Sequence, residues 1–262
     1  MSPLGASHAE VRALRKLLRS RHEREVCREF VIEGPRVLAA ALDHDVALTT
    51  VYASAAARGH EVVVRAEARG ITVRELAVGV EDRIGDTVTP QGVFALAPLR
   101  RAPVDALDRA TFVLVADRVS DPGNAGTLVR SAAASGAGAI TLGVGSVDAY
   151  NPKVVRATAG ALFVVPVVEG RSTPEVLDRL GGRGLRRIAA NAHGGTPLDA
   201  MDLTGPVAIV VGHEVEGLGS LPVDDTVTIP MAPGTESLNL AMAATVLCFE
   251  AQRQRGLDEA QA

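Results

Sequence analysis

The sequence predicts an α/β protein: a C-terminal, mostly parallel sheet with helices on both faces, preceded by a smaller α/β unit. Two observations lead to this class. The segments FVLVADRV (112–119) and PVAIVVGHE (206–214) are continuous apolar strands, which are typical of sheets covered on both faces. Between them strands alternate with helices, as parallel pairing requires. Because ligands bind at the carboxyl ends of such strands, we expect a site in the loops that follow them.

The remaining elements of the C-terminal part follow in order. DPGN (121–124) has the composition of a turn, and the helix after it ends at Gly136. Further strands are expected at 139–144, 164–169 and 186–192, and further helices at 152–163 and 173–180.

The last stretch, 227–255, combines a short strand, a Pro/Gly loop and a helix. No charge appears between Leu240 and Phe249, and a helix that is apolar on all faces is expected to be buried. Four polar residues precede this helix: Thr235, Glu236, Ser237 and Asn239. Ser237 or Asn239 alone would serve as an N-cap, whereas the whole cluster after a loop favours a ligand cradle.

Residues 30–97 alternate in the same way and predict a small three-layer α/β unit. Strands are expected at 30–34, 48–54, 71–76 and 92–99, and helices at 35–44, 60–70 and 80–87. PLRRAP (98–103) has the character of a linker, so we place the domains at 1–98 and 109–262, joined by 99–108.

A basic segment lies before this unit. Four cations fall on one face of a predicted helix: Arg12, Arg15, Lys16 and Arg19. Because glutamates are interspersed, one interpretation is a solvated helix face. The other is a helix that contacts nucleic-acid phosphates.

Composition sets the broad limits. The chain has 262 residues and a net charge of −4, so any binding to phosphates must come from local clusters. Cys27 and Cys248 form neither a metal-ligand spacing nor a disulfide framework, which suits a reducing cytoplasm. No apolar run reaches about 18 residues and no signal peptide is recognisable. We therefore expect a cytoplasmic protein with no metal and no membrane segment.

Familiar catalytic motifs are weak or missing. GVGSVD (143–148) begins like a dinucleotide-binding fingerprint, but Asp148 stands at its sixth position. No Walker A motif and no G-x-S-x-G elbow occur, and His213-Glu214 lacks the second histidine of a zinc helix.

Three loops remain as candidates. In the first, Asn124 precedes a helix and Arg130 lies about two turns into it. Arg130 is either an ion-pair residue that reaches outward or, in a cleft, a partner for an anion. The second loop, GHEVEGLG (212–219), has glycines that permit close backbone approach to a ligand, and Glu214 is either an ordinary loop carboxylate or part of the site. The third is the Ser237–Asn239 turn.

Together these loops resemble the SpoU/TrmH family of RNA 2′-O-ribose methyltransferases, which belongs to the SPOUT superfamily. The resemblance spans nearly the whole chain and rests on the segments DPGNAG, YNPKVVRATAGALF, GHEVEGLG and IPMAPGTESLNLAMAA, with FVIEGPRVLAAAL and TPQGVFAL in the N-terminal part. His213 and Val215 depart from the small polar residue and glycine that often flank the family's glutamate.

The resemblance implies a C-terminal trefoil knot, an N-terminal RNA-binding domain, an obligate homodimer and S-adenosylmethionine as methyl donor. Ribosomal RNA, most specifically 23S RNA, is the favoured substrate, and transfer RNA or a catalytically silent RNA-binding role are the alternatives. The implied catalytic positions are Asn124, Arg130, Glu214, Ser237 and Asn239, and the implied cofactor-binding positions are Asn191, Gly212, Ile229, Met231, Leu238 and Ala243.

Overall fold

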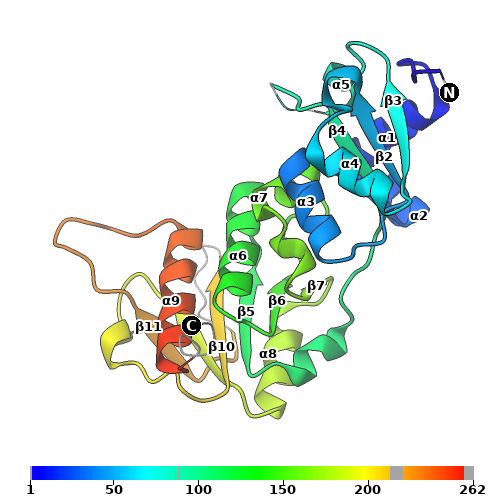
Figure 1. Cartoon of the computed structure of the whole chain (residues 1–262). Helices are drawn as coiled ribbons and strands as arrows, with labels where there is room; N and C mark the ends of the chain where they lie inside the picture. The colour runs from blue at the N-terminus through cyan, green and yellow to red at the C-terminus, as the bar shows by residue number, and fades with distance from the viewer. Residues whose placement is uncertain (1, 86, 88, 213–220, 257–262) are drawn as a thin grey trace. The chain divides into compact units, whose positions relative to one another are not determined.

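The computed structural model describes residues 2–85, 87, 89–212 and 221–256. The chain divides into two compact units (Figure 1). Unit 1 comprises Met1–Arg100 together with Tyr150–Phe163, and unit 2 comprises Arg101–Ala149 together with Val164–Ala262. The segment 150–163, which the sequence analysis placed in the C-terminal domain, therefore packs with unit 1.

Within the part of unit 1 that the structure describes, four strands form a sheet in the order β1-β4-β2-β3. β4 is antiparallel to β1 and β2, and β2 is parallel to β3. The strands are β1 (Glu29–Glu33), β2 (Thr50–Ser54), β3 (Thr72–Leu76) and β4 (Val93–Pro98). The helices are α1 (Ala9–Arg19), α2 (Arg21–Cys27), α3 (Pro35–Asp43), α4 (Glu61–Ala68), α5 (Glu81–Ile84) and α7 (Pro152–Thr158), with short 3₁₀ turns η1 (Ala55–Ala57) and η3 (Ala161–Phe163). Each strand expected between residues 30 and 99 is thus present.

The basic segment forms two helices because Ser20 breaks it. Ser20 has extended backbone angles and ends α1, and its hydroxyl accepts a hydrogen bond from the backbone N–H of Glu23 to cap α2. The buried face of α1 packs onto the sheet in one apolar cluster with Val31, Tyr52 and Phe94. The cationic residues lie on the opposite side of that helix.

The helix expected over 152–163 stops at Thr158. Ala159 and Gly160 both have positive φ angles, 51° and 101°, which end the helix in the left-handed conformation. A side chain at Gly160 would place its Cβ 2.3 Å from the Cβ of Ala40. The close approach of α3 therefore requires glycine at this position.

In unit 2 the described residues form a seven-stranded sheet in the order β7-β6-β5-β10-β8-β11-β9. Every pairing in it is parallel, which confirms the predicted mostly parallel sheet. The strands are β5 (Phe112–Asp117), β6 (Ala139–Leu142), β7 (Val167–Glu169), β8 (Arg186–Ala190), β9 (Thr196–Pro197), β10 (Val207–Gly212) and β11 (Asp225–Thr228). The helical elements are η2 (Val104–Arg109), α6 (Pro122–Ala134), α8 (Thr173–Gly182), η4 (Leu198–Ala200) and α9 (Leu240–Gln254).

Alternate residues of the central strands pack against helices on opposite faces of this sheet. Val113, Val115 and Val210 share one apolar cluster with α8 and η2. The buried residues of α6 and α9 lie outside that cluster, and these two helices pack on each other and on β5 and β10 (Figure 1). The sheet is therefore covered on both faces, as its continuous apolar strands predicted.

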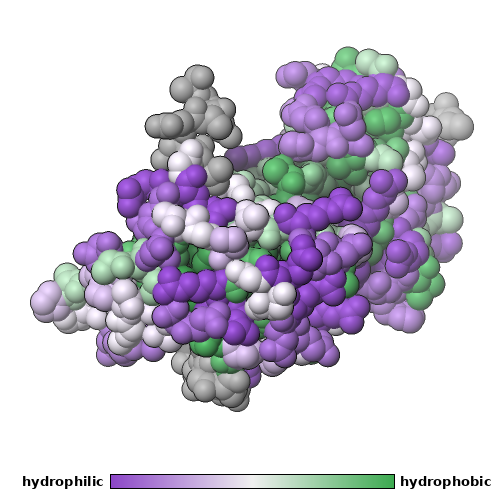
Figure 2. Space-filling view, turned by 90° about the horizontal axis from the view of Figure 1, so that it is seen from below, coloured by the Kyte–Doolittle hydropathy of each residue, from purple (hydrophilic) through white to green (hydrophobic). Residues whose placement is uncertain are grey.

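The prediction that the helix after Asn239 is buried on all faces was wrong. Ala241, Ala244, Leu247, Cys248 and Ala251 of α9 are buried. Met242, Val246 and Phe249 instead expose 62%, 42% and 45% of their surface. Hydrophilic residues cover most of the face drawn in Figure 2, and hydrophobic residues show between them in patches. An exposed apolar stripe at helical spacing is typical of an interaction surface.

Candidate active site

A cavity of about 770 Å³ lies in unit 2 at the carboxyl ends of β8, β10 and β11. Parallel pairing sets this position. Ala189 is in register with Val210 on one side and with Thr226 on the other, so the loops after all three strands leave the sheet at the same edge. The backbone N–H of Asn191 donates to the Val227 carbonyl at 2.8 Å and continues the ladder into the cavity wall.

The six residues that the resemblance assigned to cofactor binding all line this cavity, and so does one of the predicted catalytic residues. They are Asn191, Gly212, Ile229, Met231, Leu238 and Ala243, together with Ser237. They come from four separate segments of the chain. The cofactor role of each residue stays a prediction.

One wall of the cavity was anticipated from the sequence only at Ala243. Leu240, Ala243 and Leu247 line it from α9, at the spacing of one helix face. Val211 contributes from β10. Because every position from Leu240 to Phe249 is uncharged, the sequence held no periodic signal that could separate this face from the others. His193, in the loop after β8, is a polar lining residue that was missed, whereas Glu236 belongs to the polar cluster named in the sequence analysis.

Asn239 joins two helices. Its side-chain oxygen accepts from the backbone N–H groups of Ala241 and Met242 at 3.0 and 3.3 Å, which makes it the N-cap of α9. Its amide nitrogen donates to the side-chain oxygen of Asn124 at 3.1 Å. The N-cap interpretation therefore describes Asn239, and a catalytic role for this residue stays a prediction. Asn124 lies in the first turn of α6, where its backbone N–H donates to the capping carboxylate of Asp121 at 2.7 Å.

α6 and α9 run side by side in the same direction. The Asn124–Asn239 bond joins their first turns, and Ser131 and Thr245 are hydrogen-bonded at 2.7 Å about two turns further on. Two helix N-termini therefore meet beside the Ser237–Asn239 turn. The aligned dipoles of the two helices favour negative charge at that place.

Arg130 is not brought into the cavity by the single chain. It is exposed on α6 and does not line the cavity. Ser131 faces α9, so Arg130 is turned about 100° away from that contact. The guanidinium of Arg130 forms no hydrogen bond or ion pair with the residues that the structure describes. Glu214 lies outside the described residues.

The four cations predicted to bind RNA belong to α1 in unit 1. Arg12, Lys16 and Arg19 are exposed and Arg15 is half-buried, while Val11, Leu14, Leu17 and Leu18 on the same helix are buried. The cations thus form the outer face of an amphipathic helix.

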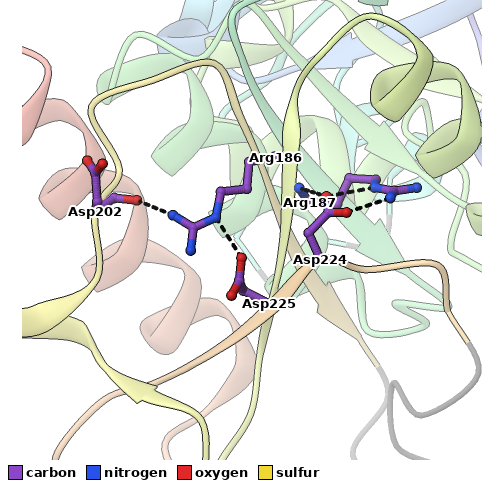
Figure 3. Close-up of polar contacts among 5 residues, drawn as sticks. All are labelled: Arg186, Arg187, Asp202, Asp224 and Asp225. Carbon is purple, nitrogen blue, oxygen red and sulfur yellow. Dashed lines mark hydrogen bonds and ion pairs between the residues drawn. The ribbon is translucent and has the colours of Figure 1, made fainter.

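Paired arginines and aspartates fix the strand that supplies one side of the cavity (Figure 3). The Asp224 carboxylate accepts from Nη2, Nε and the backbone N–H of Arg187 at 2.6, 2.9 and 2.8 Å. Nε of Arg186 donates to Asp225 at 2.6 Å, and its Nη1 donates to the Asp202 carbonyl at 3.2 Å. These bonds hold the start of β11 against the start of β8 and so set the register at the cavity.

The sequence of this chain matches two known protein-family models. Residues 111–249 match the model of the SpoU rRNA Methylase family, and residues 8–95 match an MRM3-like substrate binding domain. The chain is 31% identical over 244 residues to the 23S rRNA (guanosine(2553)-2′-O)-methyltransferase RlmP of Bacillus subtilis, a match that covers 89% of this chain and 92% of the relative. This chain belongs to the SpoU rRNA methylase family. The resemblance seen in the sequence is therefore confirmed.

Further matches, one of sequence and one of structure, come from Streptomyces viridochromogenes. The 23S rRNA (uridine(2479)-2′-O)-methyltransferase is 32% identical over 255 residues, covering 91% of this chain and 88% of the relative. A crystal structure of the SpoU methyltransferase AviRb in complex with the cofactor AdoMet superposes with a TM-score of 0.83 at 30% identity, covering 95% of this chain and 98% of that one. Both units thus have counterparts in a solved SpoU structure.

The described residues of this SpoU chain contain no group of three or more His, Cys, Asp or Glu side chains arranged to hold a metal ion. Within the same part of the chain, no helix combines the length and apolar character needed to cross a membrane.

The Asp224–Arg187 pair generates a prediction about stability. Hydrogen bonds from the Arg187 side chain and backbone lower the pKa of the Asp224 carboxyl from 3.8 to about 2. A lowered pKa means that this pair stabilises the fold fully above about pH 4 and loses that effect as the pH falls toward 2. At pH 7, Asp224→Asn should lower the melting temperature by roughly 2 °C, the size expected of a partly exposed pair.

Thermal unfolding followed by circular dichroism between pH 3 and 7 measures this effect. The difference between wild type and Asp224→Asn should shrink below about pH 4. Asp199→Asn, which removes the same charge from an exposed position on η4, is the matched control and should change little. A difference of equal size at every pH would show that the charge on Asp224 is irrelevant.

Proposed function

We propose that this chain transfers a methyl group from S-adenosylmethionine to a ribose 2′-hydroxyl of 23S ribosomal RNA, and that it works in the cytoplasm. One observation carries the proposal: in a chain of the SpoU family, the residues expected to hold the cofactor converge on one cavity. The two curated relatives described above are named for 23S rRNA but for different nucleosides. The proposal therefore extends to the RNA and not to the nucleotide.

The cavity suits S-adenosylmethionine in size and lining. Its volume of about 770 Å³ falls within the range of small-molecule sites, roughly 300–1,000 Å³. Leu240, Leu247 and Val211 supply an apolar surface for a planar adenine. Backbone groups around Gly212, Ile229 and Leu238 supply polar contacts for the ribose and the base edge. When bound, S-adenosylmethionine supplies a methyl group activated by a sulfonium charge.

Arg130 is the proposed catalytic cation. A ribose hydroxyl is a poor nucleophile, so the negative charge that develops on its oxygen needs a partner. A guanidinium stays protonated in proteins and so cannot serve as the base. Arg130 would instead orient the 2′-oxygen and stabilise its charge. The first turns of α6 and α9 add their dipoles to the same effect.

The polar residues near these helix ends would position the reactants. Asn124 and Asn239 hold each other across the two helices, which fixes the turn that carries Ser237. Glu214 is proposed to act in the same site on the ground of its family position. Correct positioning of two reactants is worth roughly 7–11 kcal/mol in the best cases, so small displacements of this turn should cost activity.

The proposed active form is a homodimer. The exposed stripe of Met242, Val246 and Phe249 on α9 offers an apolar surface for a second copy of the chain. Arg130 does not line the cavity of its own chain, so we assign it to the cavity of the partner subunit. The family also implies the trefoil knot, which we propose for the chain after β10.

Unit 1 is the proposed RNA-binding part. Its sequence holds 16 Lys and Arg against 13 Asp and Glu, whereas unit 2 holds 11 against 18. The chain is therefore acidic overall but basic in the unit that matches a substrate binding domain. The exposed cationic face of α1 is the local cluster that the sequence analysis required for contact with phosphates.

We predict that Arg130→Ala lowers kcat for 23S rRNA by at least about 100-fold, the loss expected when a group that stabilises an oxyanion is removed. S-adenosylmethionine affinity should stay close to normal because Arg130 is proposed to contact the ribose 2′-oxygen of the RNA and not the methyl donor. Transfer of radiolabelled methyl groups to 23S rRNA measures kcat, and calorimetric titration measures the affinity for S-adenosylmethionine. Arg109→Ala, another exposed arginine of unit 2, is the control. A fully active Arg130→Ala enzyme would show that Arg130 takes no part in methyl transfer.

Mixing two inactive variants tests whether Arg130 acts on the partner's cavity. Ala243→Phe would block the cavity while leaving Arg130 intact. A mixed dimer with Arg130→Ala then contains one intact cavity faced by one intact arginine. Recovery of methyl transfer on mixing supports the shared site, and its absence in a mixture that forms mixed dimers contradicts it.

A separate prediction concerns α1. Replacing Arg12, Arg15, Lys16 and Arg19 by alanine should weaken 23S rRNA binding and reduce the slope of log K against log salt by roughly 3, because four phosphate contacts are lost. Filter binding at several salt concentrations gives both values. Exchanging the three arginines for lysine keeps the charge and should nearly preserve the slope. Unchanged affinity in the alanine variant would make this face an ordinary solvated surface.

A further inference from the structure

A second cavity, of about 230 Å³, lies within unit 1. Its lining is unusual for this chain, which has only five Phe, two Tyr and no Trp. Three of these seven aromatic residues, Phe30, Tyr150 and Phe163, line the cavity. They come from β1, from the residue two places before α7, and from η3, so the fold collects them from distant parts of the sequence.

The inner wall of this cavity is formed by packed aromatic rings. Phe30 is 2% exposed and Tyr150 8%, and their rings meet edge to face with centroids 4.8 Å apart. The Tyr150 hydroxyl donates a hydrogen bond to the Arg100 carbonyl. This bond fixes the tyrosine ring and holds the backbone of Arg100 at the cavity.

The outer rim is polar and reaches solvent. His44, Asp45, Ala47 and Arg100 line the cavity and are exposed. With the residues that the structure describes, neither the His44 imidazole nor the Arg100 guanidinium forms a hydrogen bond or ion pair. A packing defect in a core would be apolar and closed, whereas this cavity has fixed rings inside and free donors at its mouth.

We propose that this cavity receives one unpaired nucleobase of the RNA substrate, an inference that rests on the proposed function. A base is planar and aromatic with polar edges, and proteins read single-stranded RNA by stacking such bases on aromatic side chains and bonding their edges. The cavity is smaller than the roughly 300 Å³ at which sites for drug-sized ligands begin. It therefore suits a single base, with Arg100 placed to meet the adjoining phosphate or the base edge.

Photocrosslinking of the full-length protein tests this placement. The probe is a 23S rRNA transcript made with 4-thiouridine and 6-thioguanosine, and adducts are located by mass spectrometry after proteolysis. We expect adducts on peptides that contain Tyr150 or Phe163. His44→Ala combined with Arg100→Ala alters only exposed residues, so the variant should fold. It should reduce these adducts about ten-fold and raise KM for the RNA, as loss of one stacked base would.

The matched control is Arg36→Ala, which removes an exposed arginine of α3 that lines no part of this cavity. Its adducts at Tyr150 and Phe163 should persist. Methyl transfer to the same transcript separates the possible failures. Methylation with adducts on α1 but none at the cavity overturns this inference alone. A transcript that is neither methylated nor crosslinked contradicts the proposed function, and the inference with it.

Discussion

The parallel alignment of β8, β10 and β11 is the constraint on which the rest of the site depends. Parallel strands end at one edge of a sheet, so three loops that are distant in sequence must leave at the same place. The register is held at the opposite end of the strands, where Arg186 and Arg187 bind Asp225 and Asp224 (Figure 3). A slip there would move Val227 away from Ala190 and separate the walls of the cavity.

Ten consecutive uncharged residues in α9 provide three different apolar faces, although the helix is not buried on all sides. One face, with Ala244, Cys248 and Ala251, packs inside unit 2. A second face lines the cavity through Leu240, Ala243 and Leu247. The third exposes Met242, Val246 and Phe249. Core, ligand and proposed partner each require an apolar surface, and together they use the whole circumference of the helix.

Much of the fold could be predicted from local patterns. The continuous apolar strands at 112–119 and 206–214 indicated a sheet covered on both faces, because burial of both faces leaves no polar alternation. The end of the helix at Thr158 could not be predicted, since it depends on the approach of Ala40 to Gly160 from another element. The packing of 150–163 with unit 1 is likewise a tertiary contact that strand and helix periodicity does not encode.

The candidate site was predictable in a different way. The positions predicted to bind a cofactor came from the family resemblance of short loops, and those positions line one cavity. The partner of Asn239 was not predictable, because a hydrogen bond to Asn124 joins residues 115 positions apart. The aromatic cavity of unit 1 left no local pattern either, since Phe30, Tyr150 and Phe163 become neighbours only in the fold.

Calorimetric titration of S-adenosylmethionine into wild-type protein and into Ala243→Phe tests the central claim most directly. If the ends of β8, β10 and β11 together with α9 enclose the methyl donor, the wild-type protein binds S-adenosylmethionine. A phenyl ring in that wall then weakens binding at least about ten-fold. The melting temperature of the variant shows that it is folded. Equal affinity in the two proteins, or no binding by wild type, would contradict the account.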